Sequence, residues 1–123
     1  MDRRLFLRDS AGLVAGAPAL LAHNPPRTDA VRIACIGVKG RGMRLTRSFS
    51  SAKDSVVTTI CDVDLNVCGP AVKIAEERQG TKPKVVQDLR RVMDDKQVDA
   101  VAIATPDHWH ALAAVWACQA GKD

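Results

Sequence analysis

A parallel α/β sheet with helices on both faces is predicted by three features of this 123-residue sequence. Two segments, 31–36 and 98–104, have the continuous apolar character of strands that are covered on both faces. Strand-like and helix-like segments alternate from residue 31 onwards, which is typical of parallel strands joined by right-handed crossovers. Glycines follow the first strand, where a strand passes into a helix. The sequence therefore predicts a doubly wound parallel sheet whose ligand lies at the carboxyl ends of the strands.

The glycine-rich segment after the first strand predicts a phosphate-binding loop. It consists of Gly37, Val38, Lys39, Gly40, Arg41 and Gly42. Peptide N–H groups and the positive end of the helix dipole converge at such a junction, where glycine lets an anion come close to the backbone. The G-x-G-x-x-G pattern is imperfect, because Lys39 stands where its second glycine would let a pyrophosphate approach. The basic residues between positions 37 and 53 fit a phosphate, and they fit a solvated helix face equally well.

An acidic residue at the end of the second predicted strand indicates a nucleotide. Asp62 ends the β-branched segment 55–62 and lies 20 residues beyond Gly42, the spacing at which an acid can hydrogen-bond the ribose hydroxyls of an adenosine. A carboxylate there repels the 2′-phosphate of NADP, and Asp64 adds to the repulsion, so we expect NAD as the cofactor rather than NADP. The alternative is an aspartate that caps the following loop or helix.

Two helices and two strands are expected to follow the second strand. They are a helix from 69–70 to Gly80, a strand at 84–87, a helix at 89–94 and a strand at 98–104. Pro70 is tolerated in the first turn of a helix, and Gly80 is a typical helix terminator. Asp88 is expected to cap the short helix that follows it.

The last helix is predicted to be amphipathic and to end at Gly121. The apolar residues that recur at its three- and four-residue spacing are Trp109, Leu112, Trp116 and Ala120. We interpret Trp109 as a core residue rather than as a platform on which a ligand stacks.

The loop between the fourth strand and this helix, residues 105–110, is expected at the same edge as the glycine loop. Pro106 fits a helix entry, and Asp107 is a candidate cap for the helix. His108 and His110 are two positions apart and point to different sides of a helix, so we expect no metal site.

Residues 1–29 are predicted to be an export signal and a linker. A charged start is followed by an apolar segment rich in alanine and glycine, with cleavage plausible after Ala19 or Ala22. Arg3-Arg4 resembles the twin-arginine type of signal, which carries folded proteins across the bacterial inner membrane. We therefore expect a partnership with the export machinery and a periplasmic location, with a membrane anchor formed by an uncleaved signal as the alternative.

The charge and the cysteine spacing of the sequence argue against nucleic-acid binding and against a metal site. The net charge of +4 is modest, and no basic patch interleaved with aromatic residues predicts nucleic-acid binding. The four cysteines show no metal-binding spacing, and we expect Cys35 and Cys61 to lie in the core as small hydrophobic residues.

At these residues the chain resembles the Gfo/Idh/MocA oxidoreductases. The resemblance rests on segments 36–42, 61–64, 99–111 and 116–123. It implies that 30–123 is an NAD(P)-binding Rossmann domain, followed in the family by a C-terminal α/β domain for substrate and for homo-oligomer contacts. It also implies hydride transfer on a small sugar or polyol substrate.

The resemblance also assigns roles to individual positions. Gly37, Gly40 and Gly42 would hold the pyrophosphate and Asp62 the adenosine ribose, while Thr105, Pro106 and His110 would line the nicotinamide side. The family's Glu-Lys-Pro motif, whose lysine supports catalysis, is not reached before Asp123. We therefore expect a Rossmann-like domain that breaks off after its fourth strand and helix, with no catalytic residue and no turnover of its own.

Three functional hypotheses remain open. The first is the cofactor domain of an NAD-dependent sugar-type dehydrogenase. The second is the same domain in a glycoside hydrolase that uses tightly held NAD for transient oxidation. The third is a nucleotide-binding module without turnover, which Lys39 and the missing lysine motif favour.

Overall fold

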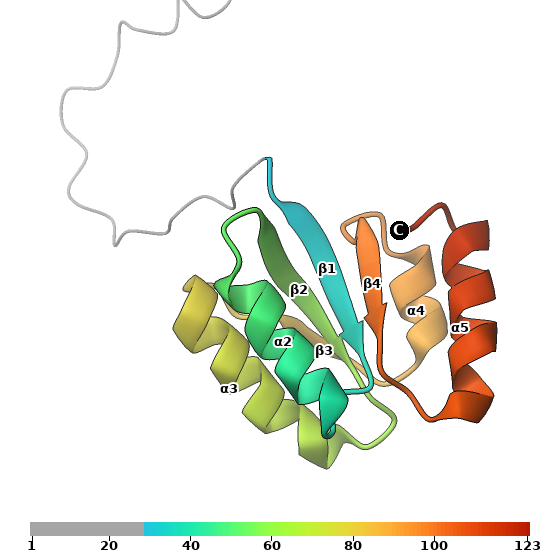
Figure 1. Cartoon of the computed structure of the whole chain (residues 1–123), viewed down its shortest axis with the longest axis horizontal. Coiled ribbons are helices and arrows are strands. Elements are labelled where there is room, and N and C mark those ends of the chain that lie inside the picture. The colour runs from blue at the N-terminus through green and yellow to red at the C-terminus, as the bar shows by residue number, and fades with distance from the viewer. Residues whose placement is uncertain (1–28) are drawn as a thin grey trace, which may run out of the picture.

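The four strands form one parallel sheet in a computed structural model that describes residues 29–123 (Figure 1). The strands are β1 (Val31–Ile36), β2 (Ser55–Cys61), β3 (Lys84–Val86) and β4 (Ala100–Ile103). Their order in the sheet is β3-β2-β1-β4, so the chain moves outward from β1 in one direction and then crosses back to the other side. This reversal beside β1 confirms the doubly wound fold, and it places a ligand crevice at the carboxyl ends of β1 and β4.

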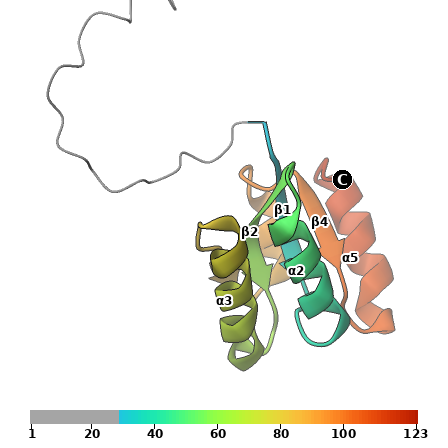
Figure 2. The same cartoon turned by 60° about the vertical axis from the view of Figure 1, so that its left-hand side comes forward.

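Helices cover both faces of the sheet. They are α2 (Arg41–Ser51), the 3-10 helix η1 (Leu65–Val67), α3 (Cys68–Gln79), α4 (Leu89–Asp94) and α5 (Asp107–Gln119). Helices α2 and α3 lie on one face, and α4 and α5 lie on the other (Figure 1, Figure 2). The sheet is therefore the middle of three layers.

The position of β1 between β2 and β4, with helices on both faces, explains why its sequence is continuously apolar. Ile33 and Cys35 pack in the cluster with α2 and α3, whereas Ala34 and Ile36 pack in the cluster with α4 and α5. None of the four side chains is more than 5% exposed. Burying an isoleucine side chain contributes about 1.5–3 kcal/mol to the free energy of unfolding. A polar residue at any of these four positions would therefore lower the stability of the packing on one face of the sheet.

Capping residues behave largely as the sequence predicts. Asp88 caps α4, because its Oδ1 accepts a hydrogen bond of 3.0 Å from the backbone N–H of Arg90. Gly80 ends α3 in the left-handed conformation, with φ of 78°. Helix α3 begins at Cys68, slightly before the predicted start, because η1 runs directly into it and is itself capped by Asp64.

Helix α5 differs from the prediction in two ways. Ala113 and Ala117 are its buried residues, whereas Trp109 and Leu112 are 45% and 40% exposed. The small side chains face the sheet because they let the helix approach it closely. Trp116 is half-buried and packs against the core, so the predicted apolar face is right for Trp116 and wrong for Trp109 and Leu112. Asp107 is also not a cap: it is the first helical residue, and the N-cap position belongs to Pro106, which makes no side-chain cap.

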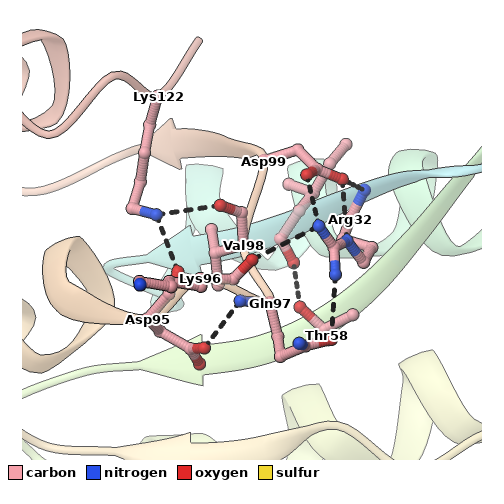
Figure 3. Close-up of polar contacts among 9 residues, drawn as sticks. Arg32, Thr58, Asp95, Lys96, Gln97, Val98, Asp99 and Lys122 are labelled. Carbon is pink, nitrogen blue, oxygen red and sulfur yellow. Dashed lines mark hydrogen bonds and ion pairs between the residues drawn. The ribbon is translucent and has the colours of Figure 1, made fainter.

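A polar network lies at the amino ends of β1 and β4, at the opposite end of the strands from the glycine loop (Figure 3). Arg32 of β1 donates from Nε and Nη2 to the carboxylate of Asp99, at 2.9 and 2.7 Å. The guanidinium lowers the pKa of Asp99 to about 2. The buried Nζ of Lys122 donates to the carbonyl oxygens of Asp95 and Val98, each at 2.8 Å. These contacts hold the segment after α5 against the loop that leads into β4.

The predicted export signal lies outside the described residues, apart from position 29, so the signal stays a prediction. Within residues 29–123 no helix has the length and apolar character needed to cross a membrane. Cys35 and Cys61 are both 1% exposed, which confirms that they are core residues. Burial raises the pKa of the Cys61 thiol to about 12, so this sulfur stays protonated at neutral pH.

Candidate functional site

Two glycines bring the loop after β1 against the loop after β4. Gly37 has a φ of 78°, and a Cβ there would lie 2.8 Å from the carbonyl carbon of Ala104. A Cβ at Gly42 would lie 1.6 Å from the carbonyl oxygen of Gly37. Real Cβ atoms do not approach backbone this closely, so both positions require glycine for packing, independently of any ligand.

The N-terminus of α2 is open in front of this loop. Gly40 is the N-cap residue, no side chain caps the helix, and a Cβ at Gly40 would meet nothing within 4 Å. Among the described residues, the backbone N–H groups of Lys39 and Gly40 donate no hydrogen bond to another backbone or side chain. The first turn holds no acidic residue. Unpaired N–H groups and the positive end of the helix dipole therefore face open space, which suits an anion such as a phosphate.

Asp62 connects the glycine loop with the turn after β2. Its Oδ2 accepts a hydrogen bond of 3.0 Å from the backbone N–H of Val38, and its Oδ1 accepts one of 3.0 Å from the N–H of Asp64. The carboxylate thus does cap the following turn, which was the alternative to ribose binding. An ionised carboxylate accepts about four hydrogen bonds, so capacity for two ribose hydroxyls remains.

A cavity of about 760 Å³ lies at the carboxyl ends of the strands. Four of the predicted site residues line it: Gly37, Asp62, Thr105 and Pro106. They come from the ends of β1, β2 and β4, which confirms that the loops lie at one edge of the sheet. The volume is within the range of pockets that hold a small molecule or a cofactor, about 300–1,000 Å³.

The other predicted site residues do not line this cavity. Val38 is buried in the loop and Gly42 in the first turn of α2, while Lys39, Gly40 and Arg41 are exposed around the start of that helix. These five still surround the open helix N-terminus, where a pyrophosphate was predicted.

His110 lies on the exposed surface of α5 and is not a lining residue. His108 and Trp109 line the cavity instead. The interpretation of Trp109 as a core residue is therefore wrong. No group of three or more potential metal ligands occurs in the described part of the chain.

The part of the cavity wall that is formed by the residues after β3 was not predicted from the sequence. Residues 87–90 line the cavity, and so does Trp116 of α5. Gln87 Nε2 donates to the carbonyl oxygen of Val63 at 2.8 Å, so the ends of β2 and β3 are tied together beside Asp62. The signal that could have identified this wall is its position directly after a parallel strand, because such positions share one edge of the sheet.

One polar atom in the cavity wall has no partner. Thr105 Oγ1 is buried and makes no hydrogen bond among the described residues. A buried hydroxyl without a partner is costly, by about 1–3 kcal/mol, and a ligand that supplies the partner removes this cost. The unpaired hydroxyl, the free acceptors of Asp62 and the open N–H groups of α2 form a donor and acceptor set that fits a dinucleotide.

Residues 31–123 match the oxidoreductase family Gfo/Idh/MocA, described as having an NAD-binding Rossmann fold. The chain belongs to this family. Family membership gives the domain its ligand class, because the family is described by an NAD-binding Rossmann fold.

Several curated Gfo/Idh/MocA relatives are named as glycosyl hydrolases. A glycosyl hydrolase family 109 protein of Stenotrophomonas maltophilia is 34% identical over 129 residues, which cover 98% of this chain and 28% of that protein. An alpha-N-acetylgalactosaminidase of Shewanella oneidensis is 32% identical over 126 residues, covering 96% of this chain and 28% of that protein. This Gfo/Idh/MocA chain thus spans little more than a quarter of the length of these relatives.

Solved structures support the same fold. A scyllo-inositol dehydrogenase of Lactobacillus casei with bound NAD(H) and scyllo-inositol matches with a TM-score of 0.63 at 19% identity, over 76% of this chain and 26% of that chain. GenD2, from gentamicin A biosynthesis and in complex with NAD, matches with a TM-score of 0.64 at 20% identity, over 91% of this chain and 28% of that chain. A 3-ketoreductase of Actinomadura kijaniata in complex with NADP matches with a TM-score of 0.62 at 24% identity, over 76% of this chain and 27% of that chain.

Proposed function

We propose that this chain is the NAD-binding part of a longer enzyme that moves a hydride to or from a carbon of a sugar or polyol. The observation that carries the proposal is the meeting of the glycine loop and Asp62 at one cavity, joined by the hydrogen bond from Val38 N–H to the Asp62 carboxylate. An anion-binding helix end and a nearby hydroxyl-binding carboxylate are the two requirements of an adenosine diphosphate moiety.

Different residues of the site bind different parts of the cofactor in this proposal. The loop of Gly37, Gly40 and Gly42, with the open N–H groups at Lys39 and Gly40, holds the pyrophosphate, and Asp62 accepts hydrogen bonds from the adenosine ribose. Thr105 and Pro106 lie on the nicotinamide side, with Thr105 Oγ1 supplying a hydrogen bond, and we place His110 on that side as well. Bound NAD supplies a carbon that accepts and returns a hydride.

The substrate class is proposed from the relatives. Solved neighbours include a dehydrogenase with bound scyllo-inositol, and curated relatives above 30% identity are named as glycosyl hydrolases. All of these names involve cyclic polyhydroxylated substrates. The curated relatives favour a second form of the function, in which the whole protein hydrolyses a glycoside and the hydride returns to the substrate, so that no net NADH is formed.

Cofactor binding and turnover are tested separately. We expect the 123-residue chain to bind NAD in a calorimetric titration and to form no NADH, measured at 340 nm, with a panel of sugars and inositols. In a full-length protein that contains this domain, NADH formation indicates a dehydrogenase, whereas aglycone release without net NADH indicates the glycosidase. Absence of NAD binding by the folded chain would contradict the proposed function.

Export through the twin-arginine route is proposed from Arg3-Arg4 and the apolar segment after it. Residues 1–29, fused to a reporter that is active only when it folds before translocation, are expected to deliver it to the periplasm. Replacing both arginines by lysine should stop delivery, because the two side chains differ in hydrogen-bonding geometry despite their equal charge. Unchanged delivery by the lysine pair would show that another route is used.

A further inference from the structure

Among the described residues, a single arginine borders the cavity, and its side chain is paired with a carboxylate. Arg90 is the only lysine or arginine among the described residues that line the cavity. Its Nε donates to both carboxylate oxygens of Asp88, at 3.0 and 3.1 Å, and its Nη2 donates to Oδ2 at 2.6 Å. The Arg90 side chain is 72% exposed, so it lies at the rim of the cavity rather than in its floor.

Asp88 and Asp62 are neighbours at the strand ends. The backbone N–H of Asp62 donates to the carbonyl oxygen of Val86, two residues before Asp88, at 3.3 Å. The thiol of Cys61, the residue before Asp62, donates to the carbonyl oxygen of Gln87, the residue before Asp88, at 4.0 Å. The Asp88–Arg90 pair therefore lies on the side of the cavity where Asp62 meets the adenosine ribose.

We propose that Asp88 is a specificity-determining residue, which favours NAD over NADP by holding Arg90 in an ion pair at the ribose end of the cavity. The proposal rests on the proposed function, because it concerns the nucleotide bound at this site. A 2′-phosphate entering the cavity meets the carboxylates of Asp62 and Asp88 and finds the Nε and Nη2 side of the guanidinium already paired with Asp88. Without Asp88, the planar guanidinium could bind the phosphate through paired hydrogen bonds.

Asp88 can be changed without removing the cap of α4. Its Oδ1 accepts a hydrogen bond from the Arg90 backbone N–H, and asparagine and serine are about as good at this N-cap position as aspartate. Asp88→Asn and Asp88→Ser therefore remove the charge that engages the guanidinium while they keep the helix start.

The test compares two nucleotide pairs on the full 123-residue chain: NAD with NADP, and ADP with adenosine 2′,5′-bisphosphate. Asp88→Asn and Asp88→Ser should each raise the affinity for the 2′-phosphorylated member by about tenfold relative to its partner, the scale of a newly made charged hydrogen bond. Adding Arg90→Met to either variant should abolish the gain, since methionine keeps a flexible unbranched apolar side chain without the guanidinium.

The outcomes separate this inference from the proposed function. An unmutated chain that is folded but binds no NAD overturns both. A chain that binds NAD, with an NAD to NADP preference that neither Asp88 variant changes, overturns the inference alone. A gain that persists with Arg90→Met also overturns it, because the shift would then come from the lost negative charge rather than from the released guanidinium. Thermal unfolding of each variant is the control for stability. Equal unfolding temperatures show that a change in affinity does not come from a loss of folded protein.

Discussion

Replacing Gly42 by alanine is expected to destabilise the fold by at least about 3 kcal/mol, the upper range of overpacking in a tightly packed site. The new Cβ would lie 1.6 Å from the carbonyl oxygen of Gly37, and that oxygen belongs to backbone that is itself pressed against Ala104. Neither segment can move without separating α2 from β1. A loss of this size is a large fraction of the stability of a small domain, which is about 5–15 kcal/mol.

The effect is measured by thermal or urea unfolding, followed by circular dichroism, with Gly69→Ala as the matched control. Gly69 lies in the first turn of α3, where a Cβ would meet nothing within 4 Å, and alanine favours a helix by up to about 1 kcal/mol over glycine. The control should therefore unfold at the same temperature as the unmutated chain or slightly above it. Equal stability of Gly42→Ala and Gly69→Ala would contradict the packing described for the glycine loop.

Replacing Asp62 by alanine is expected to weaken NAD binding by about 1–3 kcal/mol, the scale of lost hydrogen bonds to a charged group. This corresponds to an increase in the dissociation constant of about 5- to 150-fold. The affinity for NADP should fall less, because the same substitution removes a charge that repels the 2′-phosphate. Calorimetric titration of both dinucleotides measures the difference.

Asp64→Asn is the control for charge alone. Asp64 is exposed and caps η1 through a hydrogen bond from the N–H of Asn66 at 3.0 Å, which asparagine can also accept. It removes one negative charge two residues from Asp62, so we expect a much smaller change in NAD affinity. Tighter binding of NADP than NAD by the unmutated protein would contradict the assignment of Asp62 to the ribose.

The strand and helix order was predictable because each element carries its own local pattern. The apolar segment of β1 reports burial on both faces, and the structure confirms it with Ile33 and Ile36 on opposite sides of the sheet. Asp88 and Gly80 were predictable as cap and terminator for the same reason, since capping depends on a few neighbouring residues. Asp62 was predictable as a candidate from its spacing to Gly42.

Helix α5 shows where local pattern was insufficient. Every residue from 111 to 118 is apolar or small, so periodicity alone could not tell which face meets the sheet. The distance between α5 and the sheet decides this, and close approach selects Ala113 and Ala117. Trp109 is left 45% exposed beside the cavity as a result, in a place that no sequence pattern predicts.

The sequence by itself determined the fold class, and it identified the glycine loop and Asp62 as candidates for an anion site and a ribose site, because these patterns depend on residues within one βαβ unit. Only the tertiary structure decided that Gly42 is required by the carbonyl oxygen of Gly37, and that Arg90 and Asp88 share a cavity with Asp62. Arg90 and Asp62 are 28 positions apart and follow different strands. Their proximity is a consequence of parallel pairing between β2 and β3, which brings the ends of both strands to one edge of the sheet.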